Sequence, residues 1–99
     1  MYCIQYIDSN FQEPLSLTEM AKRSAMSKSS FCNVFNTLTG YSFKQYLNLK
    51  RIEHAVKLIK KGYQLTAIYG LCGYEDYSTF IRNFKKIMGV SPSHYQTNN

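Results

Sequence analysis

Short polar side chains recur at matching positions in two helical segments of the chain. In KSSFCNVFNTL, a helical period places four such side chains opposite Phe31 and Phe35: Ser29, Cys32, Asn33 and Asn36. In YSTFIRNFKKIM, the equivalent face carries Ser78, Ile81, Arg82 and Lys85. Side chains of these types can reach base edges in a major groove, and an exposed Ile81 would suit a thymine methyl group. The alternative for Ile81 is packing against Tyr77 or a neighbouring loop.

Groups suited to phosphate are expected close to both faces. The unpaired N–H groups at a helix N-terminus attract anions, and helices are expected to begin at Ser42 and Ser91. Four lysines add positive charge near these points: Lys28, Lys44, Lys85 and Lys86. For each lysine, a solvated surface position is an equally good interpretation. Arg51 lies beside an apolar stripe, so its alternative role is that of a structural ion-pair partner.

The distribution of charge favours the same class of partner. The 99-residue chain has a net charge of +6, and the segment from Lys22 to Lys61 contains nine Lys or Arg and one acid, Glu53. A basic surface of this kind suits a polyanion, although charge alone would also fit a surface that only keeps the domain soluble. The chain has no apolar run long enough for a membrane span and no signal-peptide pattern, so we expect a cytoplasmic protein without a membrane partner.

Catalysis and metal binding are not expected. The three cysteines, Cys3, Cys32 and Cys72, show no CxxC spacing, and their odd number favours reduced thiols. His54 and His94 lie far apart without a Cys or His at ligand spacing. The chain also lacks the spacing of a nucleophile and its base. We therefore predict neither an enzyme nor a bound metal or cofactor.

Residues 42–61, SFKQYLNLKRIEHAVKLIKK, form the element that must position both polar faces. They contain no proline or glycine, and Ser42 suits an N-cap. On a helix their apolar side chains fall on two nearly opposite stripes: Leu49, Ile52, Ala55, Val56 and Ile59 on one, and Phe43, Leu47 and Leu58 on the other. A helix with two apolar faces is expected to lie between packed layers. This segment therefore predicts a connector between two small helical units.

Shorter helices are expected on either side of the connector. Ser16 and Glu19 form a capping box for a helix that runs to Ala25, and Ser27 caps a helix that stops before Gly40. Further helices are expected over residues 1–9, 65–72 and 77–88, with a last one from residue 91. The predicted core includes Ile4, Ile7, Phe31, Val34, Phe35, Leu38, Phe80, Phe84 and Ile87. Because no segment alternates like a strand, the predicted fold class is all-α.

The chain contains an internal repeat. Five residues recur 49 positions later: Phe31, Phe35, Gly40, Ser42 and Tyr46 match Phe80, Phe84, Gly89, Ser91 and Tyr95. Each copy consists of a short helix, a tight turn, a longer helix and a Gly-x-Ser that opens another helix. This order is that of two consecutive helix-turn-helix units. We therefore divide the chain into a first subdomain at residues 1–41, a connecting helix at 42–61 and a second subdomain at 62–99.

Two segments carry a resemblance to a known family. SLTEMAKRSAMSKSSFCNVFNTLTGYSFKQYLNLKRIEHA and GYEDYSTFIRNFKKIMGVSPSHY resemble the DNA-binding domain of AraC/XylS-family transcription regulators, over nearly the full length of the chain. The resemblance implies seven helices, with two helix-turn-helix units that a long helix joins and that enter successive major grooves. It also implies base-reading roles for Ser29, Cys32, Asn33, Tyr77, Ser78, Ile81 and Arg82.

The sequence departs from the family pattern at two positions. Tyr69 stands where the family usually has alanine, so the first helix of the second unit is expected to be shifted or poorly formed. Gln96 stands where arginine is common, which weakens an expected phosphate contact. The effector and dimerisation domain that most members carry is absent from these 99 residues. Both a stand-alone regulator and a piece of a longer one remain open.

These observations predict a sequence-specific bacterial transcription regulator, expected to be an activator. Its partner is double-stranded DNA, with RNA polymerase and an effector or dimerisation domain as further candidate partners. The alternative is a helical protein-interaction module that uses exposed aromatic residues as anchors: Tyr2, Tyr63 and Tyr77. Salt dependence separates the two, because only DNA binding should weaken steeply as salt rises.

Overall fold

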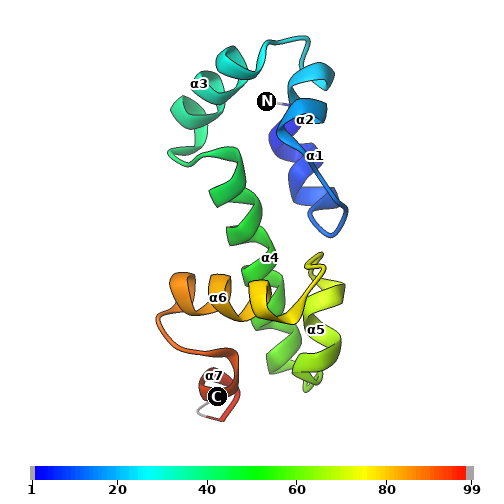
Figure 1. The fold of residues 1–99 in the computed structure, drawn as a ribbon, viewed down its shortest axis with the longest axis vertical. Helices are drawn as coiled ribbons and strands as arrows, with labels where there is room; N and C mark the ends of the chain where they lie inside the picture. The colour runs from blue at the N-terminus through cyan, green and yellow to red at the C-terminus, as the bar shows by residue number, and fades with distance from the viewer. Residues whose placement is uncertain (1, 98–99) are drawn as a thin grey trace.

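Seven helices and no strand make up residues 2–97, the part of the chain that the computed structural model describes (Figure 1). The helices are α1 (Tyr2–Asn10), α2 (Leu17–Arg23), α3 (Lys28–Thr39), α4 (Phe43–Lys60), α5 (Leu65–Leu71), α6 (Tyr77–Met88) and α7 (Pro92–Thr97). This result confirms the all-α prediction and the central connector. The expected start of the first helix at Met1 lies outside the described residues. The molecule is elongated, measuring 44 × 21 × 21 Å.

Side-chain caps set where several helices begin. The hydroxyls of Ser16, Ser27 and Ser42 each accept a hydrogen bond from the backbone N–H three residues later. At the start of α4, the Gln45 side chain also accepts from the Ser42 N–H at 2.9 Å, which completes a capping box. Gly40 ends α3 in the left-handed conformation that glycine adopts without strain. The three predicted serine caps are thus confirmed. The capping box expected at Ser16 is not completed, because the Glu19 carboxylate pairs with Nε of Arg23 at 3.4 Å instead.

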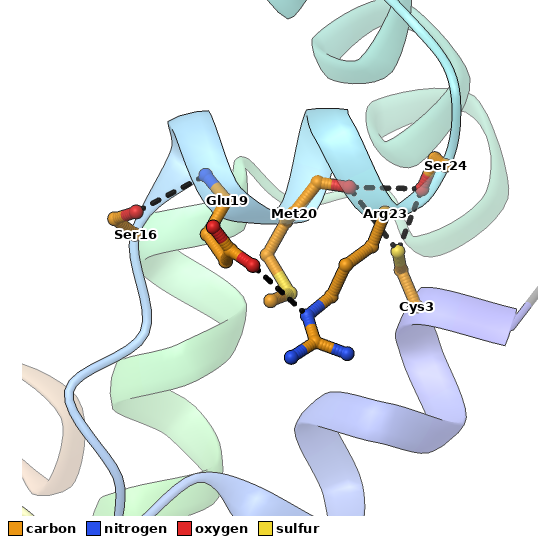
Figure 2. A network of polar contacts seen from close by, with 6 residues as sticks. All are labelled: Cys3, Ser16, Glu19, Met20, Arg23 and Ser24. Atoms are coloured by element: carbon orange, nitrogen blue, oxygen red, sulfur yellow. Dashed lines mark hydrogen bonds and ion pairs between the residues drawn. The ribbon is translucent and has the colours of Figure 1, made fainter.

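Helix α2 ends earlier than the sequence suggested. Ala25, its predicted last residue, has a φ of +56° and lies outside the helix, which ends at Arg23. Figure 2 shows why the chain turns here: the Ser24 hydroxyl donates to the Met20 carbonyl at 3.0 Å and lies 2.7 Å from the Cys3 sulfur. The C-terminal end of α2 is therefore held against α1, and the next residues turn toward α3.

The two units have separate hydrophobic cores. The first core consists of Cys3, Ile7, Met20, Ala21, Phe31, Phe35, Phe43 and Leu47. The second consists of Ile52, Ala55, Leu58, Ile59, Ile68, Cys72, Tyr74, Phe80 and Phe84. The N-terminal half of α4 thus belongs to the first core and its C-terminal half to the second. Leu58, expected on the same stripe as Phe43 and Leu47, packs in the second core because the cores are separated along α4 as well as around it.

Two predicted core residues lie at the surface. Val34 is 36% exposed and Leu38 is 57% exposed, whereas Phe31 and Phe35 on the same helix are fully buried. The cause is that α3 has fewer neighbouring helices than α6, the equivalent helix of the second unit. Helix α6 packs against α4, α5 and α7, but α3 packs mainly against α2 and α4. One flank of α3 therefore stays uncovered. In α1, Cys3 is fully buried, whereas the predicted Ile4 is only partly buried.

Tyr69 does not prevent α5 from forming, so the expectation of a shifted or poorly formed helix is not met. Its side chain packs against the second core, and its ring makes an edge contact with the Tyr77 ring at 5.6 Å between centroids. The larger residue is accommodated by this contact, which joins α5 to the first turn of α6.

Replacing Tyr69 with alanine is therefore expected to lower the free energy of unfolding by about 1–3 kcal/mol, because it removes buried apolar area and an aromatic pair. Urea unfolding measures the change. Tyr63→Ala is the matched control: Tyr63 is 45% exposed, so its loss should cost no more than about 0.5 kcal/mol. A Tyr69→Ala protein more stable than the original would show that Tyr69 is strained instead.

Candidate DNA interface

The outer face of α3 carries the first set of predicted base-contacting residues. Ser29, Cys32, Asn33 and Asn36 are all exposed, on the side away from the buried rings of Phe31 and Phe35. The two rings stack at 5.6 Å between centroids, which orients α3 on its core. The exposed Val34 and Leu38 line a shallow hollow together with Asn33 and Thr37. The structure thus presents the four predicted residues to solvent on one helix.

The outer face of α6 carries the second set, with one correction. Ser78, Arg82 and Lys85 are exposed as predicted, but Ile81 is only partly exposed and packs against the second core. The expectation of a fully exposed Ile81 is therefore wrong, and the packing alternative accounts for much of its surface. Cys32, the equivalent residue on α3, is exposed. The two faces therefore differ in shape as well as in chemistry.

A chain of hydrogen bonds positions Arg82. Asp76 caps α6, and its carboxylate accepts from the Thr79 N–H at 2.7 Å and from the Thr79 hydroxyl at 3.0 Å. The Thr79 hydroxyl oxygen in turn accepts from Nη2 of Arg82 at 3.3 Å. The hydrogen bond from the Thr79 N–H is the main cause that lowers the pKa of the Asp76 carboxyl from its ordinary value, so this acid stays ionised beside the guanidinium. The cap formed by Asp76 and Thr79 was not predicted from the sequence, although an Asp three residues before a Thr at a helix start is a recognisable cap.

Tyr77 occupies the first position of α6 and is 38% exposed. Its ring contacts the Tyr69 ring at 5.6 Å and the Phe80 ring at 6.1 Å between centroids. These contacts hold the ring on the second core, so Tyr77 is a fixed side chain at the edge of the α6 face. It is a less suitable anchor for a protein partner than the more exposed Tyr2.

The candidate phosphate-binding groups lie on α3 and α6 and at the starts of α4 and α7. Lys28, Lys44, Lys85 and Lys86 are exposed, and the last two lie in the final turn of α6. Both candidate serines act as helix caps: Ser42 accepts from the Gln45 N–H, and the partly buried Ser91 accepts from the His94 N–H, each at 3.1 Å. Each hydroxyl still has its own hydrogen to donate to an anion. Gln96 donates to the Tyr63 carbonyl at 3.5 Å, so it also has a role within the second unit.

Helix α4 sets the separation of the two faces. Figure 1 shows α3 beside the N-terminal end of α4 and α6 across its C-terminal half. The 18 residues of α4 span about 27 Å at 1.5 Å per residue. In residues 2–97, no group of three or more His, Cys, Asp or Glu could hold a metal ion, and no helix is long and apolar enough to cross a membrane.

The chain is similar in sequence to known helix-turn-helix proteins. A family model described as a helix-turn-helix domain matches residues 20–98. Over 97 residues, the chain is 31% identical to the multiple antibiotic resistance protein MarA of Escherichia coli (strain K12), covering 97% of this chain and 76% of MarA. A protein named as a probable transcriptional regulator, LumQ of Photobacterium leiognathi, is 30% identical over 92 residues, which cover 92% of this chain and 37% of LumQ. The chain thus spans little more than a third of LumQ.

Solved structures share the fold. The DNA-binding domain of AdpA, described as a global transcriptional factor and solved in complex with a target DNA, superposes with a TM-score of 0.92. The match covers 98% of this chain and 88% of that one, at 24% identity. Two helix-turn-helix units on a long central helix are therefore an arrangement that other proteins also have.

Proposed function

The chain belongs to the AraC/XylS family of helix-turn-helix transcription regulators, and from this premise we propose how it works. It is a sequence-specific DNA-binding protein that regulates transcription. In our proposal α3 and α6 enter two successive major grooves on one side of the duplex. The protein acts as an activator in the bacterial cytoplasm, and RNA polymerase is its protein partner. An effector or dimerisation domain in a longer chain would control it.

The observation that carries the proposal is the placement of two exposed polar faces along one continuous helix, one beside the N-terminal end of α4 and the other across its C-terminal half. Successive major grooves on one side of B-DNA lie about 34 Å apart. The length of α4, about 27 Å, nearly matches this repeat, and bending of the DNA by the bound protein can make up the difference. The AdpA domain, which was solved in complex with a target DNA, shares this fold, and this supports DNA binding as part of the proposal.

Each face receives a role from its chemistry. On α3, Ser29, Cys32, Asn33 and Asn36 offer short hydrogen-bonding groups, among which an Asn amide suits adenine. On α6, Arg82 suits guanine, because its guanidinium can bind the O6 and N7 atoms together. Ser78 lies one turn before Arg82 on α6, Tyr77 begins that helix, and the exposed part of Ile81 would contact a thymine methyl. Phosphates are bound by Lys28, Lys44, Lys85 and Lys86 and by the helix starts at Ser42 and Ser91.

The alternative function is a helical protein-interaction module. The observation that favours it is the exposure of aromatic side chains outside the two faces, since Tyr2 is 60% exposed and Tyr63 is 45% exposed. These residues lie on α1 and in the loop after α4, away from α3 and α6 in the sequence. DNA binding accounts for more of the surface, because it uses both polar faces and the excess of positive charge.

Selection of bound sites from random duplex DNA tests the proposal. We expect one enriched site with two different boxes, and an affinity that falls linearly with salt on a logarithmic scale, with a slope of about −0.9 for each phosphate contact. An interaction module would enrich no sequence and would show no such slope.

On the enriched site, Arg82→Ala is expected to weaken binding by about 1–3 kcal/mol and to relax the base preference at one position, because its guanidinium would bind one base pair. Lys85→Ala is the matched control on the same helix. Its loss should weaken binding to all sequences alike and reduce the salt slope by about 1. If Arg82→Ala behaves like Lys85→Ala, then Arg82 binds phosphate and not a base.

A further inference from the structure

The connector has a short partly buried stretch between the two cores. Leu47 is the last α4 residue in the first core and Ile52 is the first in the second, so residues 48–51 belong to neither. A single helix that joins two packed units can bend, and bending at residues 48–51 would change the angle between α3 and α6. A contact that braces residues 48–51 would therefore control the geometry of the whole interface.

Arg51, the ninth of the 18 residues of α4, makes such a contact with both units. Its Nε donates to the Phe11 carbonyl at 2.8 Å and its Nη2 donates to the Glu13 carbonyl at 3.0 Å, both in the loop between α1 and α2. Its guanidinium also lies over the Tyr74 ring, 5.3 Å from the centroid, in the turn between α5 and α6. The alternative role considered for Arg51 was that of an ion-pair partner, but its observed partners are two backbone carbonyls and a ring. One side chain thus joins the first unit to the second.

Tyr74 ties the same place to the second core. Only 6% of its surface is exposed, and its ring lies 5.8 Å from the ring of Phe80, the first buried residue of α6. Its hydroxyl donates to the Asn48 side chain at 2.6 Å, and Asn48 lies at the other end of residues 48–51. The contact of Arg51 with Tyr74 therefore acts on the orientation of α6.

Gly73 lets the two units approach at this point. Its φ is +102°, and a Cβ atom there would lie 2.9 Å from the carbonyl oxygens of Phe11 and Gln12 and 3.0 Å from Nε of Arg51. Backbone oxygens cannot move away cheaply, so only glycine fits. Figure 1 shows the same approach between the blue α1–α2 loop and the yellow turn before α6. We call the seven residues of this contact the junction: Phe11, Gln12, Glu13, Asn48, Arg51, Gly73 and Tyr74.

We propose that Arg51 is a positioning residue that, through the junction, sets the distance and angle between α3 and α6 and so decides which spacing of DNA boxes the chain accepts. The inference rests on the proposed function, because it assumes that both helices bind DNA. One added base pair moves the second box by about 3.4 Å and turns it by about 35° around the duplex. A braced protein cannot follow this change, whereas a protein that bends at residues 48–51 can follow part of it.

The test measures affinity for duplexes that carry the two selected boxes at the selected spacing and with one or two base pairs added or removed. The original protein should lose about fivefold or more in affinity away from the selected spacing, because the DNA must then deform. Arg51→Lys keeps the charge but cannot repeat the paired donation to two carbonyls. With this variant, and more strongly with Arg51→Ala, the loss should shrink to about twofold or less.

Two controls separate positioning from stability and charge. Lys60→Ala removes an exposed charge from the last turn of α4, outside the junction, and should leave the spacing dependence unchanged. Gly73→Ala and Gly62→Ala strain a glycine of similar positive φ, but a Cβ at Gly62 meets nothing within 4 Å. Only Gly73→Ala should alter the spacing dependence. These glycine variants also test the junction if Arg51→Ala does not fold.

Failure of the inference about Arg51 and failure of the two-groove proposal give different results. If the Arg51 variants bind more weakly at every spacing but keep the original ratio between spacings, then Arg51 only stabilises the fold and the inference is wrong. A duplex with the second box scrambled tests the premise separately. If the original protein binds it as tightly as the two-box duplex, the two-groove proposal fails and this inference fails with it.

Discussion

Replacing Phe84 with alanine is expected to lower the free energy of unfolding by roughly 3–5 kcal/mol. Phe84 is fully buried in the second core, where its ring lies 5.9 Å from those of Phe80 and Tyr95. Truncation removes these contacts and leaves a cavity that helices on three sides cannot easily fill. Because domains of this size are stable by only about 5–15 kcal/mol, and this core is one of two, the second unit should unfold.

The same change in the first core provides a matched variant. Phe35 is also fully buried, and its ring lies 5.4 Å from the Tyr46 ring and 6.2 Å from the Phe43 ring. Since the two cores have no residue in common among the described residues, Phe35→Ala should unfold mainly the first unit. Urea unfolding followed by circular dichroism gives the total loss, and amide exchange measured by NMR shows which helices have opened.

Leu38→Ala is the control for both variants. Leu38 is a large apolar residue on α3, but at 57% exposure its truncation should change stability by no more than about 0.5 kcal/mol. A Phe84→Ala protein as stable as the original would contradict the assignment of the second core. A large loss with Leu38→Ala would show that a further element covers this flank of α3.

Local signals explain why the helices could be predicted. Ser27 and Ser42 cap the helices that follow them, and Gly40 and Gly89 end α3 and α6 in the left-handed conformation. Each of these features depends on residues within one turn, so the sequence displays them directly. The error at Ala25 has a different origin, because the contact of Ser24 with Cys3 involves residues 21 positions apart.

Burial was harder to predict, because it depends on which helices cover a face. Val34 and Leu38 follow the same helical period as the buried Phe31 and Phe35, yet they lie on a flank that no other helix among residues 2–97 covers well. Ile81 shows the opposite error, since the second core partly covers it. Periodicity gives the direction of a side chain on its own helix but does not show how far neighbouring helices extend.

For the candidate site, the two polar helix faces could be predicted from the sequence, but the contacts that orient them could not. The positions of Ser29, Asn33, Ser78 and Arg82 follow from helical spacing and from the repeat. The role of Asp76 in orienting Arg82 through Thr79, and that of Arg51 in joining the two units, depend on three-dimensional contacts. Every residue has a backbone carbonyl, so the sequence does not show that Arg51 binds two of them. The alternative of an ion-pair partner named only the structural role correctly and not the partner.

The central claim is that one chain reads two boxes on one side of the duplex, and its most direct test is the distance between those boxes. An insertion of about 5 base pairs turns the second box by half a turn, to the opposite side of the DNA. A continuous helix of about 27 Å cannot carry α6 around the duplex while α3 stays bound.

The measurement compares the affinity of the chain for three duplexes: the selected site, the same site with 5 base pairs inserted between the boxes, and the site with the second box scrambled. We predict that insertion and scrambling weaken binding equally, each by about 2 kcal/mol or more, roughly thirtyfold, because both remove the base contacts of α6. An affinity unchanged by the insertion would mean that only one unit binds DNA and would contradict the two-groove account.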